Sequence, residues 1–130
     1  MIIGVGIDLV SIDRIDKVYK KYPDRFSERI FTNQEKINFE QRGSLIAVLA
    51  ARFAAKEAVL KAIGCGIGPA ALNEVELTAL PGQQPRVKLS GEASRLAGER
   101  NITAVSISMT HEPPFACAMA VAFSVPDESS

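Results

Sequence analysis

The chain has 130 residues, of which 47% are hydrophobic and 23% are charged, and its fifteen basic side chains balance fifteen acidic ones. This composition is typical of one globular domain and excludes a disordered chain. The zero net charge provides no general field that would attract nucleic acid or a membrane surface. The charge is nevertheless uneven, because residues 1–61 carry eleven basic and eight acidic side chains, whereas residues 62–130 carry four and seven.

The two cysteines, Cys65 and Cys117, have no CxxC spacing and make no disulfide framework. We interpret them as reduced thiols and expect a cytoplasmic protein. No basic segment precedes the apolar N-terminal run, unlike a signal peptide, and no apolar stretch is long and uncharged enough to cross a bilayer. We therefore expect one domain over residues 1–125, a loose tail over 126–130, and neither a nucleic-acid nor a membrane partner.

The first predicted element is a strand over residues 2–10, and its alternation places Gly4, Gly6 and Asp8 on one face. Glycine within a strand often marks the close approach of a ligand or of another backbone. Asp8 taken alone is explained at least as well by a structural role, in which it caps the helix at Ser11 or pairs with Arg14. The opposite face of the strand is apolar, with Ile3, Val5, Ile7 and Leu9.

Ser11 is a suitable N-cap for a first helix, which is expected to end before Pro23. A short second helix is expected through residues 25–30 and a third over residues 34–39. The first two helices are rich in cations, which usually indicates a solvated helical surface. The alternative is the docking of an acidic protein helix, with Phe26 as an apolar anchor among the cations.

A helix over Leu45–Ile63 is the most unusual predicted element. Its seven alanines project onto one arc and its larger apolar residues onto the opposite arc, so the helix should be buried. One interpretation of its charges is an internal ion pair with two cations that reach the surface, and the other is a ligand site on one side of a packed helix. The charged residues are Arg52, Lys56, Glu57 and Lys61.

The glycine-rich run 64–69 is interpreted as a C-cap and turn. A dinucleotide-binding fingerprint would open a helix, whereas this run closes one. Strands are then expected over 75–80 and 86–89 around a turn at 81–83, followed by a helix that Ser90 caps.

Two further strands are expected over 104–110 and 115–123, with residues 111–114 as the hairpin loop. Alanine occupies every other position of the second strand, so alanines line one face of this strand. Alanines also line one face of the long helix. Such faces allow close packing and are also suited to meeting another subunit. We predict an α+β fold in which an antiparallel sheet packs on one long buried helix, with short helices around it.

The interior acids suggest a metal site. Asp8 and Glu57 are the two carboxylates that the pattern places in the interior, and Mg²⁺ usually takes one or two carboxylates together with water and substrate phosphates. Lys61, one turn after Glu57, is placed to neutralise a phosphate. Arg52 and Lys56 form a second basic pair one turn apart. A metal-bound diphosphate is therefore a coherent hypothesis.

The single histidine, His111, lies at a strand end, where a structural role is as common as a functional one. Because it follows Ser108 and Thr110, whose side chains point away from the core, a polar ligand site is the functional alternative.

Two blocks of sequence resemble the two motifs of the 4′-phosphopantetheinyl transferases, and specifically their small class, the holo-[acyl-carrier-protein] synthases. They are GIDLVSIDRI at residues 6–15 and RFAAKEAVLKAIGCGIG at residues 52–68. Further similar segments are RFSERIF at 25–31, VKLSGEA at 87–93 and SMTH at 108–111. The resemblance extends over essentially the whole chain.

The resemblance implies an enzyme that transfers the 4′-phosphopantetheine group of coenzyme A to a serine of an acidic apo acyl carrier protein. It implies Mg²⁺ as cofactor, adenosine 3′,5′-bisphosphate as second product, and a homotrimer with active sites between subunits. It implies Asp8 and Glu57 as metal ligands, and Glu57 and Lys61 as catalytic residues. The implied coenzyme A site is Asp8, Arg52, Lys61, Gly64 and His111. The implied carrier-docking residues are Arg14, Lys20, Lys21, Arg25, Phe26 and Arg29.

The chain departs from the family pattern at two places. Cys65 stands where threonine is usual, and residues 112–114 replace a more polar stretch after the histidine. The alternative function is a non-catalytic module that binds coenzyme A or a carrier protein.

Overall fold

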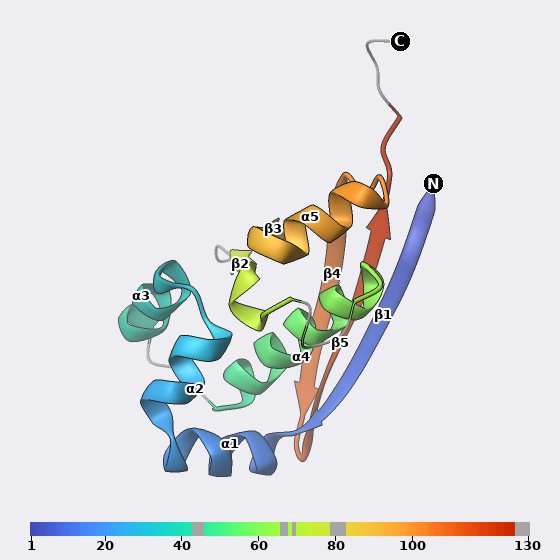
Figure 1. Cartoon of the computed structure of the whole chain (residues 1–130). Coiled ribbons are helices and arrows are strands. Elements are labelled where there is room, and N and C mark those ends of the chain that lie inside the picture. The colour runs from blue at the N-terminus through green and yellow to red at the C-terminus, as the bar shows by residue number, and fades with distance from the viewer. Residues whose placement is uncertain (43–45, 66–67, 69, 79–82, 127–130) are drawn as a thin grey trace.

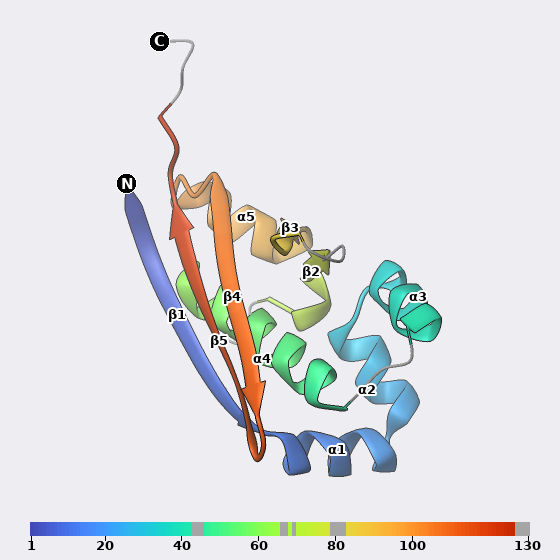
Figure 2. The same ribbon diagram turned by 180° about the vertical axis from the view of Figure 1, so that it is seen from behind.

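The computed structural model describes residues 1–42, 46–65, 68, 70–78 and 83–126. Three long strands form an antiparallel sheet in the order β1–β5–β4, and α4 lies across one face of this sheet (Figure 1 and Figure 2). The predicted α+β architecture is therefore confirmed. These four elements are β1 (Ile2–Ser11), α4 (Ile46–Ala62), β4 (Ala104–Glu112) and β5 (Phe115–Phe123).

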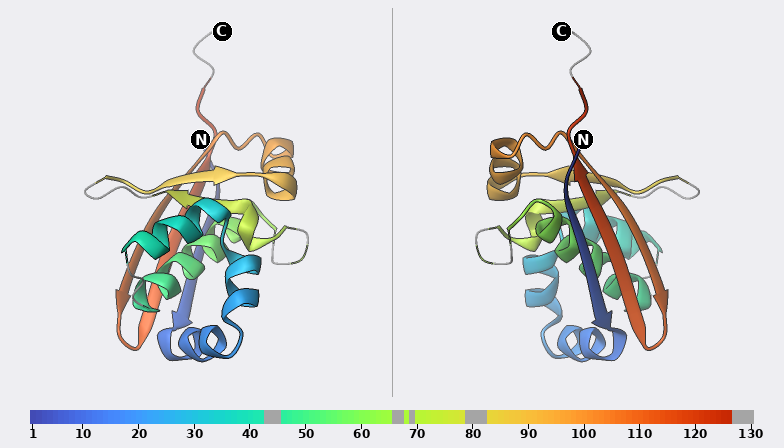
Figure 3. Two further views of the ribbon diagram at one scale, coloured as in Figure 1. Left: turned by 90° about the vertical axis from the view of Figure 1, so that its left-hand side faces the viewer. Right: turned by 90° about the vertical axis from the view of Figure 1, so that its right-hand side faces the viewer.

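The remaining elements lie around α4 on the same side of the sheet, and β2 and β3 pair there as a separate antiparallel ribbon (Figure 1). Figure 3 shows that this ribbon runs crosswise to the three long strands. The helices are α1 (Ile12–Lys21), α2 (Pro23–Ile30), α3 (Asn33–Arg42), the 3₁₀ turn η1 (Leu72–Glu74) and α5 (Gly91–Glu99), and the ribbon strands are β2 (Val75–Thr78) and β3 (Arg86–Leu89).

The alanine faces of α4 and β5 meet each other inside the protomer. Ala54, Ala58, Ala118 and Ala120 are all at most 2% exposed. The possibility that these faces meet another subunit is therefore wrong, because the protomer's own helix and sheet bury them against each other. Small side chains at both surfaces let the helix approach the sheet closely.

The outward face of the sheet carries large apolar side chains. Val5, Ile7 and Leu9 of β1 are 55%, 64% and 62% exposed, and Phe115 and Met119 of β5 are 49% and 45% exposed. The strand register places Ile7 beside Met119. An apolar stripe of this extent on a protomer usually marks a contact surface.

Several element ends differ from the predicted ones. β4 continues through Glu112, so only Pro113 and Pro114 form the hairpin turn. The Ser11 cap is present, since its Oγ accepts a hydrogen bond from Arg14 N at 3.3 Å. The side chain of Ser90 makes no such bond in α5.

A carboxylate from a neighbouring element replaces the Ser90 hydroxyl at the start of α5. Glu74 Oε2 accepts a hydrogen bond from Glu92 N, while Glu74 Oε1 accepts one from Ala71 N at 2.7 Å. A cap supplied by η1 is a tertiary contact, so local spacing could not predict it.

Several predicted features lie outside the described residues. They are the start of the long helix at Leu45, part of the glycine run at 66, 67 and 69, part of the turn at 81–82, and the tail from 127 onward. Among the described residues, no helix is both long and apolar enough to span a membrane.

Candidate active site

The site begins with the close approach of α4 to β1. A Cβ atom on Gly6 would lie 2.0 Å from the carbonyl oxygen of Ala58, and one on Gly4 would lie 2.0 Å from that of Ala62. Only glycine fits at either position. The predicted close approach is therefore to another backbone, that of α4, and it carries the side chains of the helix onto Asp8 of β1.

Lys61 joins the helix to the strand at this point. Its Nζ donates hydrogen bonds of 3.0 Å to Asp8 Oδ1 and of 3.0 Å to the carbonyl oxygen of Ile7. Asp8 is 9% exposed, whereas the Lys61 side chain is 52% exposed. The ammonium group therefore pairs with a buried carboxylate and still faces solvent on its other side.

Glu57 lies one helical turn before Lys61 and next to Asp8. Burial is the main cause that raises the pKa of Glu57 to about 7, and the negative charge of Asp8 raises it further. The positive charges of Lys61 and Arg14 oppose this rise. The negative charge of Asp8 therefore acts directly on the Glu57 carboxyl group.

The carboxylate pair fits a divalent cation. Asp8 Oδ2 is buried and receives no hydrogen bond from any donor in the described part of the chain. A buried carboxylate oxygen without a donor, beside a second carboxylate, is an environment that a hard cation satisfies. No cluster of three or more potential metal-binding side chains occurs among the described residues. Two carboxylates suit Mg²⁺, which commonly takes its other ligands from water and phosphate.

A cavity of about 470 Å³ opens at this pair, and we call it the acid pocket. Arg14 lies at its edge, and its charge acts on Glu57. Sequence reasoning assigned Arg14 to carrier docking or to Asp8, and it did not place Arg14 beside Glu57. The acid pocket is lined by Asp8, Leu9, Val10, Ser11, Arg14, Ile15, Val18, Phe26, Ile30, Phe53 and Glu57.

His111 does not line the acid pocket. The register places His111 opposite Ala116, and Ala116 opposite Val10, so two strand spacings of about 10 Å separate His111 from β1. His111 follows Thr110 in a regular strand, so its side chain lies on the opposite face of the sheet from those of Ser108 and Thr110. It is on the sheet face that α4 covers, at the far edge.

Arg52 and Gly64 also lie outside the residues that line the acid pocket. Gly64 ends α4 with a positive φ of 85°. Gly64 N donates to Lys61 O, and Cys65 N donates to Leu60 O, each at 3.0 Å. These two bonds form a Schellman C-cap, so the predicted glycine cap is confirmed.

The predicted docking residues lie on α1 and α2. Lys20 Nζ pairs with Asp16 at 3.0 Å. Lys21 and Arg25 lie over the ring of Tyr22, at 5.4 and 5.9 Å from its centroid. Tyr22 itself is 45% exposed. The aromatic side chain that reaches solvent among these cations is therefore Tyr22.

Phe26, the apolar anchor expected among the cations, is mostly buried within the protomer. Its ring is 5% exposed and contacts Tyr19, Phe31 and Phe53 at centroid distances of 5.6, 6.1 and 6.4 Å. The amphipathic pattern of α2 turns this ring inward, where it forms the floor between two cavities.

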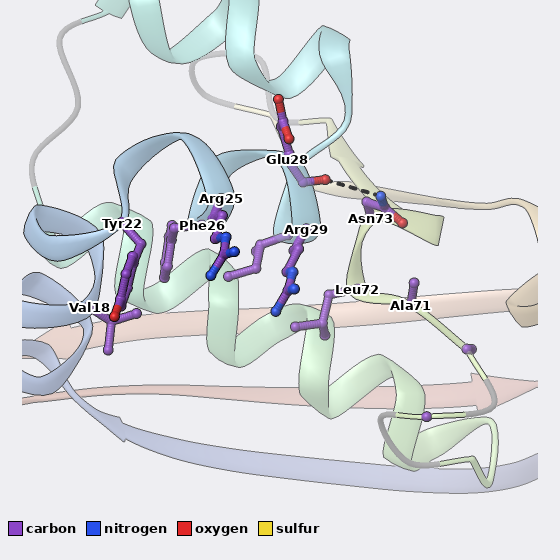
Figure 4. Close-up of a pocket in the computed structure, with 12 residues that line it drawn as sticks. Val18, Tyr22, Arg25, Phe26, Glu28, Arg29, Ala71, Leu72 and Asn73 are labelled. Carbon is purple, nitrogen blue, oxygen red and sulfur yellow. Dashed lines mark hydrogen bonds between the residues drawn. The ribbon is translucent and has the colours of Figure 1, made fainter.

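The second cavity, of about 880 Å³, is a groove between α2 and residues 68 and 70–73, and we call it the α2–η1 groove. Figure 4 shows Arg25 and Arg29 projecting from α2 over this groove, with Leu72 on the opposite side. Asn73 Nδ2 donates to the carbonyl oxygen of Glu28 at 3.2 Å and so joins the two walls. The groove combines an apolar floor with two cations.

Lys56 is not part of a phosphate-binding pair with Arg52, as the sequence suggested. It is fully buried, and its Nζ lies 2.6 Å from Glu35 Oε1. The interpretation of an internal ion pair is therefore correct for Lys56. Burial lowers the pKa of Lys56, and the charge of Glu35 opposes that shift.

Sequence reasoning missed Glu35, although a local pattern marks it. Thr32 N donates to Glu35 Oε1 at 3.0 Å, and Glu35 N donates to Thr32 Oγ1 at 3.2 Å. These reciprocal bonds form a capping box, which the Thr-x-x-Glu spacing at the start of α3 indicates.

This chain is similar to known proteins over nearly its whole length. The profile of the 4′-phosphopantetheinyl transferase superfamily matches residues 4–119. The holo-[acyl-carrier-protein] synthase of Desulforudis audaxviator is 43% identical over 129 residues, which are 99% of this chain and 98% of that protein.

Solved structures extend the likeness to three dimensions. The holo-[acyl-carrier-protein] synthase of Neisseria meningitidis superposes with a TM-score of 0.85 at 37% identity, over 95% of this chain and 99% of that one. The Helicobacter pylori enzyme of the same name, in complex with coenzyme A, superposes with a TM-score of 0.78 at 32% identity, over 92% of this chain and 99% of that one.

Proposed function

We propose that this chain, which belongs to the 4′-phosphopantetheinyl transferase superfamily, is the enzyme that transfers 4′-phosphopantetheine from coenzyme A to a serine of apo acyl carrier protein. The products are holo acyl carrier protein and adenosine 3′,5′-bisphosphate. We assign this activity to residues 1–125 as one transferase domain, acting in the cytoplasm. The observation that carries the proposal is the meeting of Asp8 and Glu57 at the acid pocket, with Lys61 hydrogen-bonded to Asp8.

The reaction is a phosphoryl transfer, which depends on positioning and on charge neutralisation. The serine oxygen forms a bond to the phosphorus on the pantetheine side, while the anhydride bond to the departing bisphosphate breaks. Glu57, or a water that it orients, is the proposed acceptor of the serine proton.

Lys61 is the proposed cation for the phosphates. Its ammonium group is fixed by Asp8 and by the carbonyl oxygen of Ile7, yet its side chain remains 52% exposed. It is therefore preorganised, with room to contact an anion that enters from solvent.

Asp8 and Glu57 are the residues that would hold Mg²⁺. The cation would supply neutralisation of the diphosphate charge. The buried Asp8 Oδ2 atom, which no described donor reaches, supports this assignment.

The acidic carrier protein is proposed to dock on the cationic surface of α1 and α2. Arg25, Arg29 and the exposed ring of Tyr22 surround the α2–η1 groove, which supplies apolar contact area beside positive charge. Arg14 lies between this surface and the acid pocket, where it would contact the carrier close to the reacting serine.

We propose a homotrimer whose subunits share the active sites. The apolar outward face of the sheet, with Ile7 and Met119 in register, supports an interface between copies of this chain. Arg52, Gly64 and His111 do not line the acid pocket of their own protomer. Arg52 and His111 are accordingly proposed to reach coenzyme A bound at a neighbouring protomer.

The test follows the release of adenosine 3′,5′-bisphosphate from coenzyme A and Mg²⁺, with and without apo carrier protein. The proposed enzyme releases it only when the carrier is present, in a one-to-one ratio with carrier modification. Release without carrier would identify a hydrolase, and no release in either case would identify a binding module.

A further inference from the structure

Lys56 is completely enclosed, with an exposed fraction of 0%, and all three hydrogens of its ammonium group have acceptors. Its Nζ donates to Glu35 Oε1 of α3 at 2.6 Å, to the carbonyl oxygen of Leu72 in η1 at 3.3 Å, and to that of Val75 in β2 at 2.5 Å. The ammonium group also lies 5.3 Å from the centroid of the Phe31 ring. Lys56 thus ties α4 to three separate elements.

The carboxylate of Glu35, which pairs with Lys56, is also fixed by several hydrogen bonds. Glu35 Oε1 also accepts a hydrogen bond from Thr32 N at 3.0 Å, and Glu35 Oε2 accepts one from Leu77 N at 3.2 Å. The Thr32 hydroxyl donates to Glu76 Oε1 at 2.7 Å. A buried ion pair is rarely the most stabilising way to fill a core, because well-packed apolar residues often serve equally well. The pair therefore calls for a function other than stability.

The packing of α4 indicates such a function. The face of α4 that meets the sheet is made of alanines and rests on two glycines, so few large side chains interlock there to fix the rotation of the helix. Hydrogen bonds and ion pairs at defined positions can fix the rotation of α4 instead. Lys61 supplies one tie, to β1, and Lys56 supplies another, about 140° away around the helix axis.

Glu57 lies between these two ties, about 100° from Lys56 and about 40° from Lys61 around the axis. We propose that Lys56, through its buried pair with Glu35, is a positioning residue that sets the rotation of α4 and so aims the Glu57 carboxylate at Asp8. The inference rests on the proposed function of the Asp8–Glu57 pair. Lys56 itself does not line the acid pocket.

The same lysine connects the two cavities. Leu72, whose carbonyl oxygen accepts from Lys56, lines the α2–η1 groove (Figure 4), whereas the next residue after Lys56 lines the acid pocket. The wall that contacts the docked carrier is thereby held at a fixed position relative to the carboxylate that receives the serine proton.

The test uses the double variant Glu35→Gln/Lys56→Met, which removes both charges and keeps the side-chain lengths. The readouts are kcat, the KM for carrier protein, coenzyme A affinity in EDTA, and the affinity for Mn²⁺ as a probe of the Asp8–Glu57 pair. We expect kcat and Mn²⁺ affinity each to fall by about 10- to 100-fold, as when other groups that orient metal ligands are removed. Coenzyme A affinity in EDTA should stay within about twofold.

The matched control is Ile102→Ala, which removes buried apolar volume near α5 and leaves the ion pair intact. At a temperature well below both melting points, the control should keep wild-type kcat and Mn²⁺ affinity. Unchanged kcat and Mn²⁺ affinity in the double variant would overturn the proposal. If the double variant does not fold, Glu35→Asp decides by the same two readouts, since it keeps the charge and shifts it by one methylene. A wild-type protein without transfer activity would contradict the proposed function. The Mn²⁺ affinities of the wild-type protein and the double variant would still test whether Lys56 positions Glu57.

Discussion

The carbonyl oxygen of Ala58 occupies the place where a side chain at position 6 would begin: a Cβ on Gly6 would lie 2.0 Å from it. This contact lets α4 approach β1 closely enough for Lys61 to bond Asp8. The two glycines of β1 are therefore part of the candidate site, although neither carries a functional group.

Gly6→Ala is accordingly expected to destabilise the fold by about 3 kcal/mol, because the helix must move away from the strand. Transfer activity should be lost with the Lys61–Asp8 bond. The control is Gly98→Ala in α5, where a new Cβ meets nothing within 4 Å. Since alanine favours helix, that change should stabilise by up to about 1 kcal/mol. Urea unfolding of both variants checks this, and equal stabilities would contradict it.

The raised pKa of Glu57 predicts a pH dependence of stability in the absence of divalent metal. The folded chain holds the Glu57 proton to about pH 7, whereas the ordinary pKa of this side chain is 4.5. The contribution of this group to stability is therefore fully present below about pH 4.5 and is lost as the pH rises through about 7.

Urea midpoints of the wild-type protein and of Glu57→Gln, measured at pH 5 and pH 8 in EDTA, test this dependence. The wild-type midpoint should fall more between the two values, and the variant should be the more stable protein at pH 8. An equal change of the urea midpoint in both proteins between pH 5 and pH 8 would show that Glu57 titrates in its ordinary range.

Charge reversal should distinguish an arginine of the α2–η1 groove from an arginine of the acid pocket. Arg25 lines the α2–η1 groove but not the acid pocket, so Arg25→Glu should raise the KM for the acidic carrier about tenfold and leave coenzyme A affinity unchanged. Arg14 lines the acid pocket, so Arg14→Glu should change kcat as well. Lys88→Glu, on the exposed side of β3, is the control. Equal effects of all three changes on the KM would exclude a local docking surface.

Shared active sites predict complementation between inactive variants. Asp8→Asn and His111→Ala should each be nearly inactive as a pure protein. In trimers reassembled from an equal mixture, about one quarter of the interfaces join an intact Asp8 to an intact His111. Activity should therefore return to about one quarter of the wild-type value. Activity that stays at the level of the pure variants would place both residues in one protomer's site.

The sequence predicted the elements of the site better than their surroundings. The alternation of β1 and the spacing of the long helix placed Asp8, Glu57 and Lys61 in the interior, because both patterns are local, and the family resemblance implied that the three residues share one site. The partner of Lys56 was not predictable in this way, since Glu35 lies 21 positions away and is selected by tertiary packing. The capping-box spacing marked Glu35 as a helix-start residue but not as a buried one.

The same limit explains the other differences. Periodicity assigned the alanines to one face of each element but could not say which surface covers that face. It also identified α2 as amphipathic, yet whether Phe26 points outward depends on α1 and α4, which bury it. Glu74 caps α5 from η1, a contact that the spacing around Ser90 does not encode.

The mass of an acidic apo acyl carrier protein, after incubation with coenzyme A, Mg²⁺ and this protein, tests the central claim most directly. The wild-type protein should add one phosphopantetheine group to each carrier. Asp8→Asn and Glu57→Gln, which remove charge from the carboxylate pair and should fold at least as stably, should add none in the same time. An unmodified carrier with the wild-type protein, or a fully modified one with either variant, would contradict the account.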